Sequence, residues 1–212
     1  MKYVLLFLLF LVQNLSSTAQ VKKSKLSLEI NYGLNGNFFV RDYDETAPPP
    51  VKLFYKKNFI GSIGGFEVKY NLSERSSIGL GYGKSVNKRE INYNNGINAS
   101  IANFNITHVN HFYQLFYETS LSKKSNNVKL QGGIFYLRMN QQEIDASPRG
   151  VSFEERDFEH NKLEEGGVFL GLHYLKKIDT KFHAGLRFRV YYLVSTSTLE
   201  AITLTPTLTY SF

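Results

Sequence analysis

The chain has 212 residues, no cysteine and a formal net charge of +7. The absence of cysteine excludes a disulfide framework and thiol chemistry, so packing and hydrogen bonds alone must stabilise the fold. The basic residues are scattered along the chain, which argues against nucleic-acid binding and favours a weak attraction to anionic lipid headgroups or surface polysaccharide.

The first 19 residues have the features of a secretory signal peptide. Lys2 supplies a positive charge, residues 4–12 are an unbroken apolar run, and Ala19 ends a stretch of small residues suited to cleavage before Gln20. The apolar run is too short for a membrane-spanning helix, which needs about 20 residues. No other segment has the length and apolarity of such a helix, so a membrane location for the mature chain, residues 20–212, would require β-strands.

Eight segments of the mature chain alternate between apolar and polar residues. Alternation with a period of two predicts strands that have one face in an apolar medium. Spans near ten residues suit tilted strands that cross a bilayer. The predicted strands are residues 25–35, 60–72, 77–90, 104–121, 128–139, 165–175, 181–194 and 203–212.

The connections between these strands alternate in length. Three are short and polar (72–77, 122–127 and 176–180), and three are long and irregular (37–59, 91–103 and 140–164). Outer-membrane barrels have short periplasmic turns and longer external loops. The pattern predicts an all-β fold, an eight-stranded antiparallel up-and-down transmembrane β-barrel after a cleaved signal peptide, with both termini in the periplasm.

Charged residues inside the predicted strands test this arrangement. A Lys or Arg on the lipid face near the bilayer centre costs about 2–4 kcal/mol, so such residues should lie on the polar face. Seven charged residues satisfy this rule, Lys129 among them. The other six form a predicted network in the barrel interior: Glu29, Glu67, Lys69, Glu118, Arg187 and Arg189. We expect Glu67 and Glu118 to pair with Arg187 or Arg189, since unpaired charges in a narrow interior are costly.

Lys84 is the exception, because it shares the outward phase of Ile78, Leu80 and Tyr82. It either extends its ammonium group to the membrane interface or follows a β-bulge that changes the phase.

Aromatic residues on the outward phase gather near both ends of the predicted strands. One group lies next to the short turns and the other lies toward the long loops. The first is Tyr70, Tyr174, Phe182, Tyr210 and Phe212, and the second is Tyr32, Tyr82, Tyr113, Tyr136 and Tyr192. Two such belts are typical of proteins whose aromatic rings lie at both headgroup levels of a membrane.

Three motifs imitate chemical sites. Gly79, Gly81 and Gly83 precede Lys84, but their spacing does not match a phosphate-binding loop, and small residues on an inward face explain them better. A cluster of carboxylates in the third long loop lacks the ordered spacing of a calcium loop; its members are Glu154, Glu155, Asp157 and Glu159. His111 is a candidate base for a lipid-modifying enzyme, but no serine two residues later completes a pair. The sequence therefore predicts no catalytic residue, no metal and no cofactor.

The central hairpin and the C-terminus resemble a known family. Residues 113–121, the turn 122–127 and residues 128–136 with Gly132 and Gly133 resemble the central hairpin of PorT-type outer-membrane β-barrel domain proteins. Leu208, Tyr210 and Phe212 resemble the C-terminal signal that the barrel-assembly machinery reads. The resemblance implies an eight-stranded barrel in the outer membrane of a Gram-negative cell envelope and no shared catalytic residues.

The sequence thus predicts a monomeric, non-enzymatic outer-membrane barrel with a structural or surface-recognition role through its long extracellular loops. The expected partners are outer-membrane lipid, the barrel-assembly machinery during insertion and a surface ligand or protein, but no nucleic acid. Two alternatives stay open: an outer-membrane enzyme that modifies lipid A, and a soluble lipocalin-like carrier with its apolar phase inside the barrel.

Overall fold

The computed structural model describes residues 25–38, 60–94, 100–122, 127–141, 145–147, 150–152 and 162–212. The predicted signal peptide and the acidic residues Glu154, Glu155, Asp157 and Glu159 lie outside these ranges. In the described ranges, no helix has the length and apolarity needed to cross a membrane.

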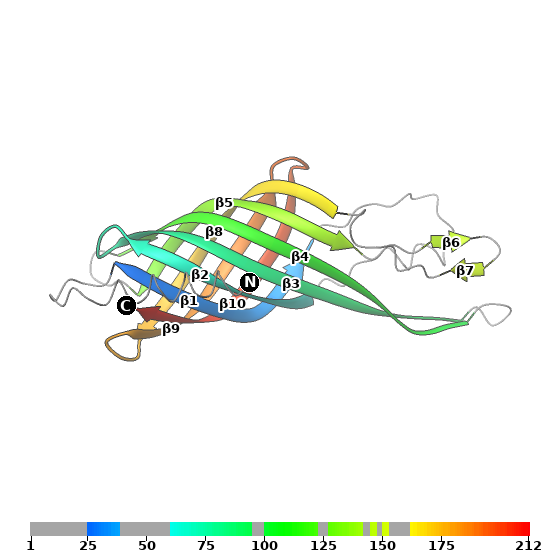
Figure 1. Cartoon of the computed structure of the whole chain (residues 1–212), viewed down its shortest axis with the longest axis horizontal. Helices are drawn as coiled ribbons and strands as arrows, with labels where there is room; N and C mark the ends of the chain where they lie inside the picture. The colour runs from blue at the N-terminus through cyan, green and yellow to red at the C-terminus, as the bar shows by residue number, and fades with distance from the viewer. Residues whose placement is uncertain are drawn as a thin grey trace, which may run out of the picture.

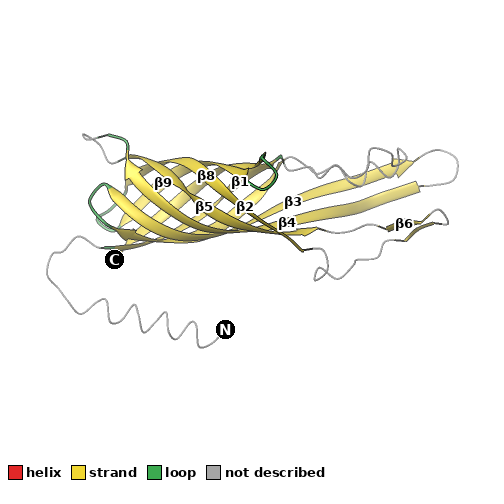
Figure 2. Ribbon diagram, turned by 90° about the horizontal axis from the view of Figure 1, so that it is seen from above, coloured by secondary structure: helices red, strands yellow, loops and turns green. Residues whose placement is uncertain are grey.

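Eight antiparallel strands form a closed barrel, as predicted (Figures 1 and 2). The order around the barrel is β1-β10-β9-β8-β5-β4-β3-β2, so the first and last strands of the chain pair and close the sheet. The strands are β1 (Leu26–Asn37), β2 (Ile60–Asn71), β3 (Ser76–Asn94), β4 (Ser100–Ser120), β5 (Val128–Gln141), β8 (Lys162–Lys177), β9 (Phe182–Leu193) and β10 (Thr198–Ser211). Closure removes the exposed sheet edges that would otherwise invite aggregation.

A proline and a glycine lie at the closing seam between β1 and β10. Pro206 lies on the outward phase of β10, opposite Leu186 of β9. Across the seam in β1, a Cβ atom on Gly33 would lie only 2.3 Å from the carbonyl oxygen of Leu204. Glycine is therefore required at position 33 for the close approach of the two strands.

The prediction that residues 91–103 form an irregular loop was wrong for residues 91–94 and 100–103, and residues 95–99 lie outside the described ranges. Strand β3 continues to Asn94 and β4 begins at Ser100, with one irregularity in register between Ile91 and Tyr93. Ile91, Tyr93 and Ile101 have high β-propensity, and the asparagines between them hide the alternation. The third long loop also contains regular structure, a small two-stranded sheet of β6 (Asp145–Ser147) and β7 (Gly150–Ser152).

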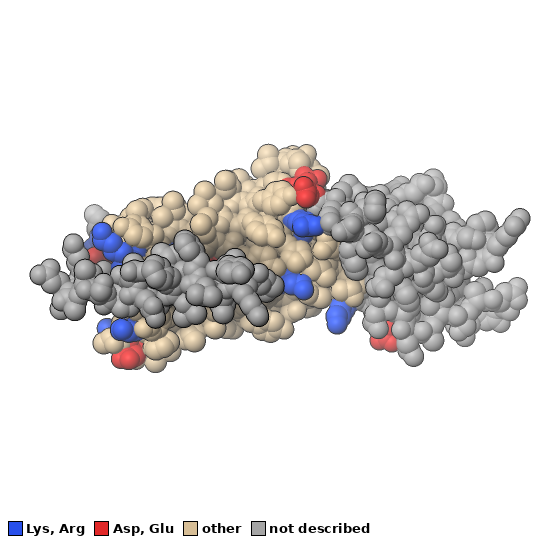
Figure 3. All heavy atoms as spheres, in the orientation of Figure 1, with Lys and Arg blue, Asp and Glu red and all other residues tan. Residues whose placement is uncertain are grey.

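The barrel strands have an apolar outer face and a buried inner face. On β9, Leu186 and Phe188 are 45% and 39% exposed, whereas Arg187 and Arg189 are 4% and 0% exposed. Leu80 on β3 and Leu170 on β8 are more exposed still, at 63% and 65%. In the described part of the face drawn in Figure 3, charged side chains lie toward the two ends of the barrel and the band between them is uncharged.

Lys84 lies on the outer face of β3, as its phase predicts. The alternative of a bulge was wrong, because the pairing of β3 with both neighbours runs through Lys84 without a shift.

Candidate functional site in the barrel interior

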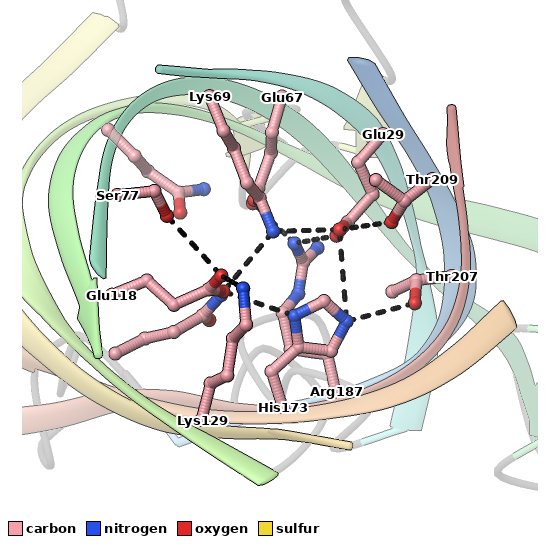
Figure 4. Close-up of polar contacts among 12 residues, drawn as sticks. Glu29, Glu67, Lys69, Ser77, Glu118, Lys129, His173, Arg187, Thr207 and Thr209 are labelled. Carbon is pink, nitrogen blue, oxygen red and sulfur yellow. Dashed lines mark hydrogen bonds and ion pairs between the residues drawn. The ribbon is translucent and has the colours of Figure 1, made fainter. Parts of the chain in front are cut away.

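The six predicted network residues all point into the barrel and are at most 4% exposed. They come from the inward phases of β1, β2, β4 and β9, and Figure 4 shows side chains of the network converging in the lumen. Strand alternation brings them together, because the residues on either side of each one belong to the outward phase.

Lys69 and Glu118 form the centre of one half of the network. The Nζ atom of Lys69 lies 2.8 Å from Oε2 of Glu29 and 3.2 Å from Oε2 of Glu118. Glu118 is also 2.8 Å from Nζ of Lys129 and accepts a hydrogen bond from Gln131. The expectation that Glu118 pairs with Arg187 or Arg189 was therefore wrong, since lysines supply its positive charge.

Two arginines form the other half. Nη1 of Arg187 lies 2.8 Å from Oε1 of Glu29 and also pairs with Glu67. Nη1 of Arg189 lies 2.6 Å from Oε1 of Glu67, as the sequence predicted for that carboxylate. Arg189 also donates to Gln114 and Gln131.

Two aromatic rings lie close to the guanidinium group of Arg189. Its central carbon is 5.0 Å from the centre of the Phe116 ring and 4.8 Å from that of Phe169. A cation near aromatic rings is attracted by the ring quadrupoles, and the attraction is larger in a buried site.

Hydroxyl groups of β10 complete the hydrogen bonding. Thr209 donates to Glu29 over 2.9 Å, and Thr207 is 3.0 Å from Nε2 of His173. Nδ1 of His173 lies 3.2 Å from Oε2 of Glu118. In this network, three carboxylates thus face four basic side chains and one histidine. Because the ions neutralise one another across the lumen, this network is suited to fixing strands in place and to filling the barrel.

An apolar layer inside the barrel was missed in the sequence. Its members are buried and lie mainly on β4, β5, β8 and β9; they are Ile63, Phe112, Phe116, Phe135, Leu137, Met139, Phe169, Tyr191, Leu193 and Ala201. The signal was present, since residues 134–137 are apolar or aromatic on both strand faces. A strand that is apolar on both faces indicates an apolar layer on its inner face as well. Phe135 and Leu137 are buried in this layer, whereas Ile134 and Tyr136 lie on the exposed outer face.

The three glycines of β3 lie on the inner face and leave room for large neighbours. A Cβ atom on Gly79 would lie 2.3 Å from Cζ of Phe116, and one on Gly81 would lie 3.2 Å from Cγ of Glu67. The glycines therefore serve packing.

His111 faces the outside of the barrel. Its Nδ1 lies 2.8 Å from the hydroxyl oxygen of Tyr82, and its neighbours in register are Lys84 and Arg138. Among the described residues, no serine or carboxylate is hydrogen-bonded to His111, and no cluster of histidine and acidic residues could hold a metal ion.

A basic cavity of about 970 Å³ opens at the short-turn end. Its lining includes Lys69, Glu118 and Lys129 of the network, and the lining residues nearer the turns include Lys177 and Lys181. The network therefore forms the inner boundary of this cavity.

No protein-family profile matches the sequence, and no curated protein matches it. Solved structures match in fold. Neisserial surface protein A aligns over 90% of this chain and 99% of its own, with 10% identity and a TM-score of 0.51. The N-terminal barrel domain of Pseudomonas aeruginosa OprF and Yersinia pestis Ail each align over 90% of this chain and 100% of their own. Their identities are 8% and 10%, and their TM-scores are 0.47 and 0.43. The chain thus has the fold of the small eight-stranded outer-membrane barrels.

Proposed function

We propose that residues 1–19 are a cleaved signal peptide and that residues 20–212 form a non-enzymatic outer-membrane protein with both termini in the periplasm. The barrel is a closed anchor, and the end that carries the long loops recognises a ligand or partner at the cell surface. A monomeric state, membership of the PorT-type family and assembly through Leu208, Tyr210 and Phe212 belong to the same proposal.

The main observation in support of this proposal is the hairpin formed by β3 and β4. Strand β2 pairs with β3 only as far as Val86, and β5 pairs with β4 only as far as His108. Beyond these points β3 and β4 pair only with each other in the described part of the chain, up to Asn94 and Ser100. At about 3.3 Å per residue, the hairpin projects roughly 20 Å past the barrel wall (Figure 1).

The outer surface supports a membrane location. Leucine, valine, isoleucine and aromatic side chains cover the outward phase of every barrel strand. A patch this large on a soluble monomer would be a liability, whereas hydrocarbon covers it at no cost. The same sidedness argues against a lipocalin-like carrier, which needs its apolar phase inside.

The enzymatic alternative has less support. A lipid-modifying enzyme needs a base that is oriented by a neighbouring acid and placed beside a nucleophile. His111 instead has a tyrosine hydroxyl and two cations as neighbours.

An epitope inserted after Asn95, between β3 and β4, tests the location and the sidedness. We expect antibody to label intact cells that carry this insertion. A matched insertion after Asp179, in the turn between β8 and β9, should be labelled only after the outer membrane is permeabilised. Labelling with the opposite dependence would reverse the orientation, and a protein recovered in the soluble periplasmic fraction would exclude the membrane location.

Photo-crosslinking tests the recognition role. A photoreactive residue at position 88 or 90, both exposed on the projecting hairpin, should give adducts of higher mass on intact cells. The same residue at position 178, in a short turn, is the control. Absence of adducts from both hairpin positions would leave the barrel with a structural role alone.

A further inference from the structure

Three basic residues form one row across the outside of the barrel near its long-loop end. Lys84 of β3 lies opposite His111 of β4, and His111 lies opposite Arg138 of β5. All three are on the outward phase; Lys84 is exposed, and His111 and Arg138 are partly exposed. At about 4.8 Å between neighbouring strands, the row is roughly 10 Å wide.

A row of aromatic rings lies directly beneath the basic row, on the side of the apolar band. Neighbouring ring centres of Phe66, Tyr82, Tyr113 and Tyr136 are 5.7, 5.4 and 6.0 Å apart. Tyrosine rings of this kind settle where hydrocarbon meets headgroups. The basic row therefore lies at the level of the headgroups if the barrel is in a membrane.

The basic row is confined to one sector of the barrel. Outward residues at the same end of β1 and β9 are apolar or aromatic, including Tyr32, Leu34 and Tyr192, which are 69%, 60% and 41% exposed. On β2 the position in register with Lys84 is Gly64, over which the ring of Tyr32 lies. A general attraction to an anionic surface would not require such a local arrangement, whereas a specific headgroup site would.

Local contacts prepare this sector for an anion. The contact between Tyr82 and Nδ1 of His111 fixes the imidazole ring between the two cations. Nε of Arg138 is buried and has no hydrogen-bond partner, and no described residue forms an ion pair with Lys84. On β8 the residue in register with Arg138 is the acidic Glu164, so the basic row ends at Arg138 on that side.

We propose that Lys84, His111 and Arg138 bind the phosphate groups of a phosphorylated glycolipid in the outer leaflet, whose acyl chains lie against the tyrosine row. This inference rests on the proposed outer-membrane location. Lys and Arg supply charge and directed hydrogen bonds to phosphate, and a row about 10 Å wide suits a headgroup with more than one phosphate.

The test uses the full mature protein in phospholipid nanodiscs, with bisphosphorylated lipid A as the probe and binding measured by native mass spectrometry. We expect the double variant Lys84→Gln/Arg138→Gln to bind lipid A at least about tenfold more weakly than the unaltered protein. The control is Lys25→Gln/Lys177→Gln, which removes the same charge from the short-turn end and should leave binding unchanged.

Two further arms identify the source of the phosphate. Dephosphorylated lipid A should bind the unaltered protein and the double variant equally weakly, and phosphatidylglycerol should compete poorly. Equal binding of lipid A by the unaltered protein and the double variant would overturn the proposed site, and so would full competition by phosphatidylglycerol. Failure of the unaltered protein to insert into bilayers would instead overturn the proposed location, so the two failures are distinguishable.

Discussion

Arg189 is a fully buried cation that lies beside two aromatic rings. Its charge is balanced by Glu67, which also pairs with Arg187 on the same strand. The sequence predicted that Arg189 lies on the inward phase, because its neighbours along the chain are apolar. Its contact with Phe116 and Phe169 was not predicted, because the stagger between distant strands sets which side chains meet.

Replacement of Arg189 by methionine should destabilise the barrel by about 3 kcal/mol, because buried Glu67 loses one of its two arginine partners. Urea titration in lipid vesicles, followed by the mobility of unboiled samples on a gel, measures the unfolding free energy. The double variant Arg189→Met/Glu67→Gln should recover part of the loss. A single variant as stable as the original protein would show that the pair contributes nothing.

Replacement of Gly79 by alanine should cost about 1–3 kcal/mol, since the added Cβ would overlap the ring of Phe116. The control is Gly166→Ala, where a Cβ would meet nothing within 4 Å. The same urea titration compares the two. Equal stability of both variants would contradict the packing role of the β3 glycines.

At the level of elements, period-two patterning predicted the existence and the phase of all eight barrel strands. Leu186, Phe188 and the arginines that alternate with them show why: the outward face is apolar and exposed, and the inward face is ionic and buried. Period-two alternation is lost where the two faces of a strand no longer differ in their surroundings. Residues 91–94 extend past the barrel, so neither face is constrained, and residues 134–137 are apolar on both faces because the inner layer is apolar there.

A charge on the outward face of a strand should lower the unfolding free energy more, the deeper it lies in the membrane. Leu80→Arg, in the middle of the apolar band, should lower the unfolding free energy in lipid by about 2–4 kcal/mol. Ile178→Arg, which adds the same charge in an exposed turn, should change it by less than about 0.5 kcal/mol. If the two substitutions had equal effects in lipid vesicles, the outer face would not be in contact with hydrocarbon.

For the whole molecule, the charged network and the apolar layer close the lumen together. The cavity at the short-turn end stops at Lys69, Glu118 and Lys129, and rings including Phe112 and Tyr191 pack beyond them. The ring centres of Phe112 and Tyr191 are 4.9 Å apart, which leaves no room for hydrated ions between them.

The purified protein in a planar bilayer should therefore give no steady ion current. Single-channel recording over a range of voltages measures this directly. A porin in the same bilayer is the positive control. Stable current steps from the unaltered protein would contradict a closed lumen.

Sidedness is the property on which the membrane account depends, and the absence of cysteine makes it measurable. Single cysteines at positions 186 to 190, each carrying a nitroxide spin label, should report oxygen and nickel-chelate accessibility in lipid vesicles. We predict high oxygen accessibility at 186, 188 and 190, and little access to either reagent at 187 and 189. Inverted alternation, or labels at 186, 188 and 190 that meet the water-soluble chelate instead of oxygen, would contradict a barrel with hydrocarbon outside and ions within.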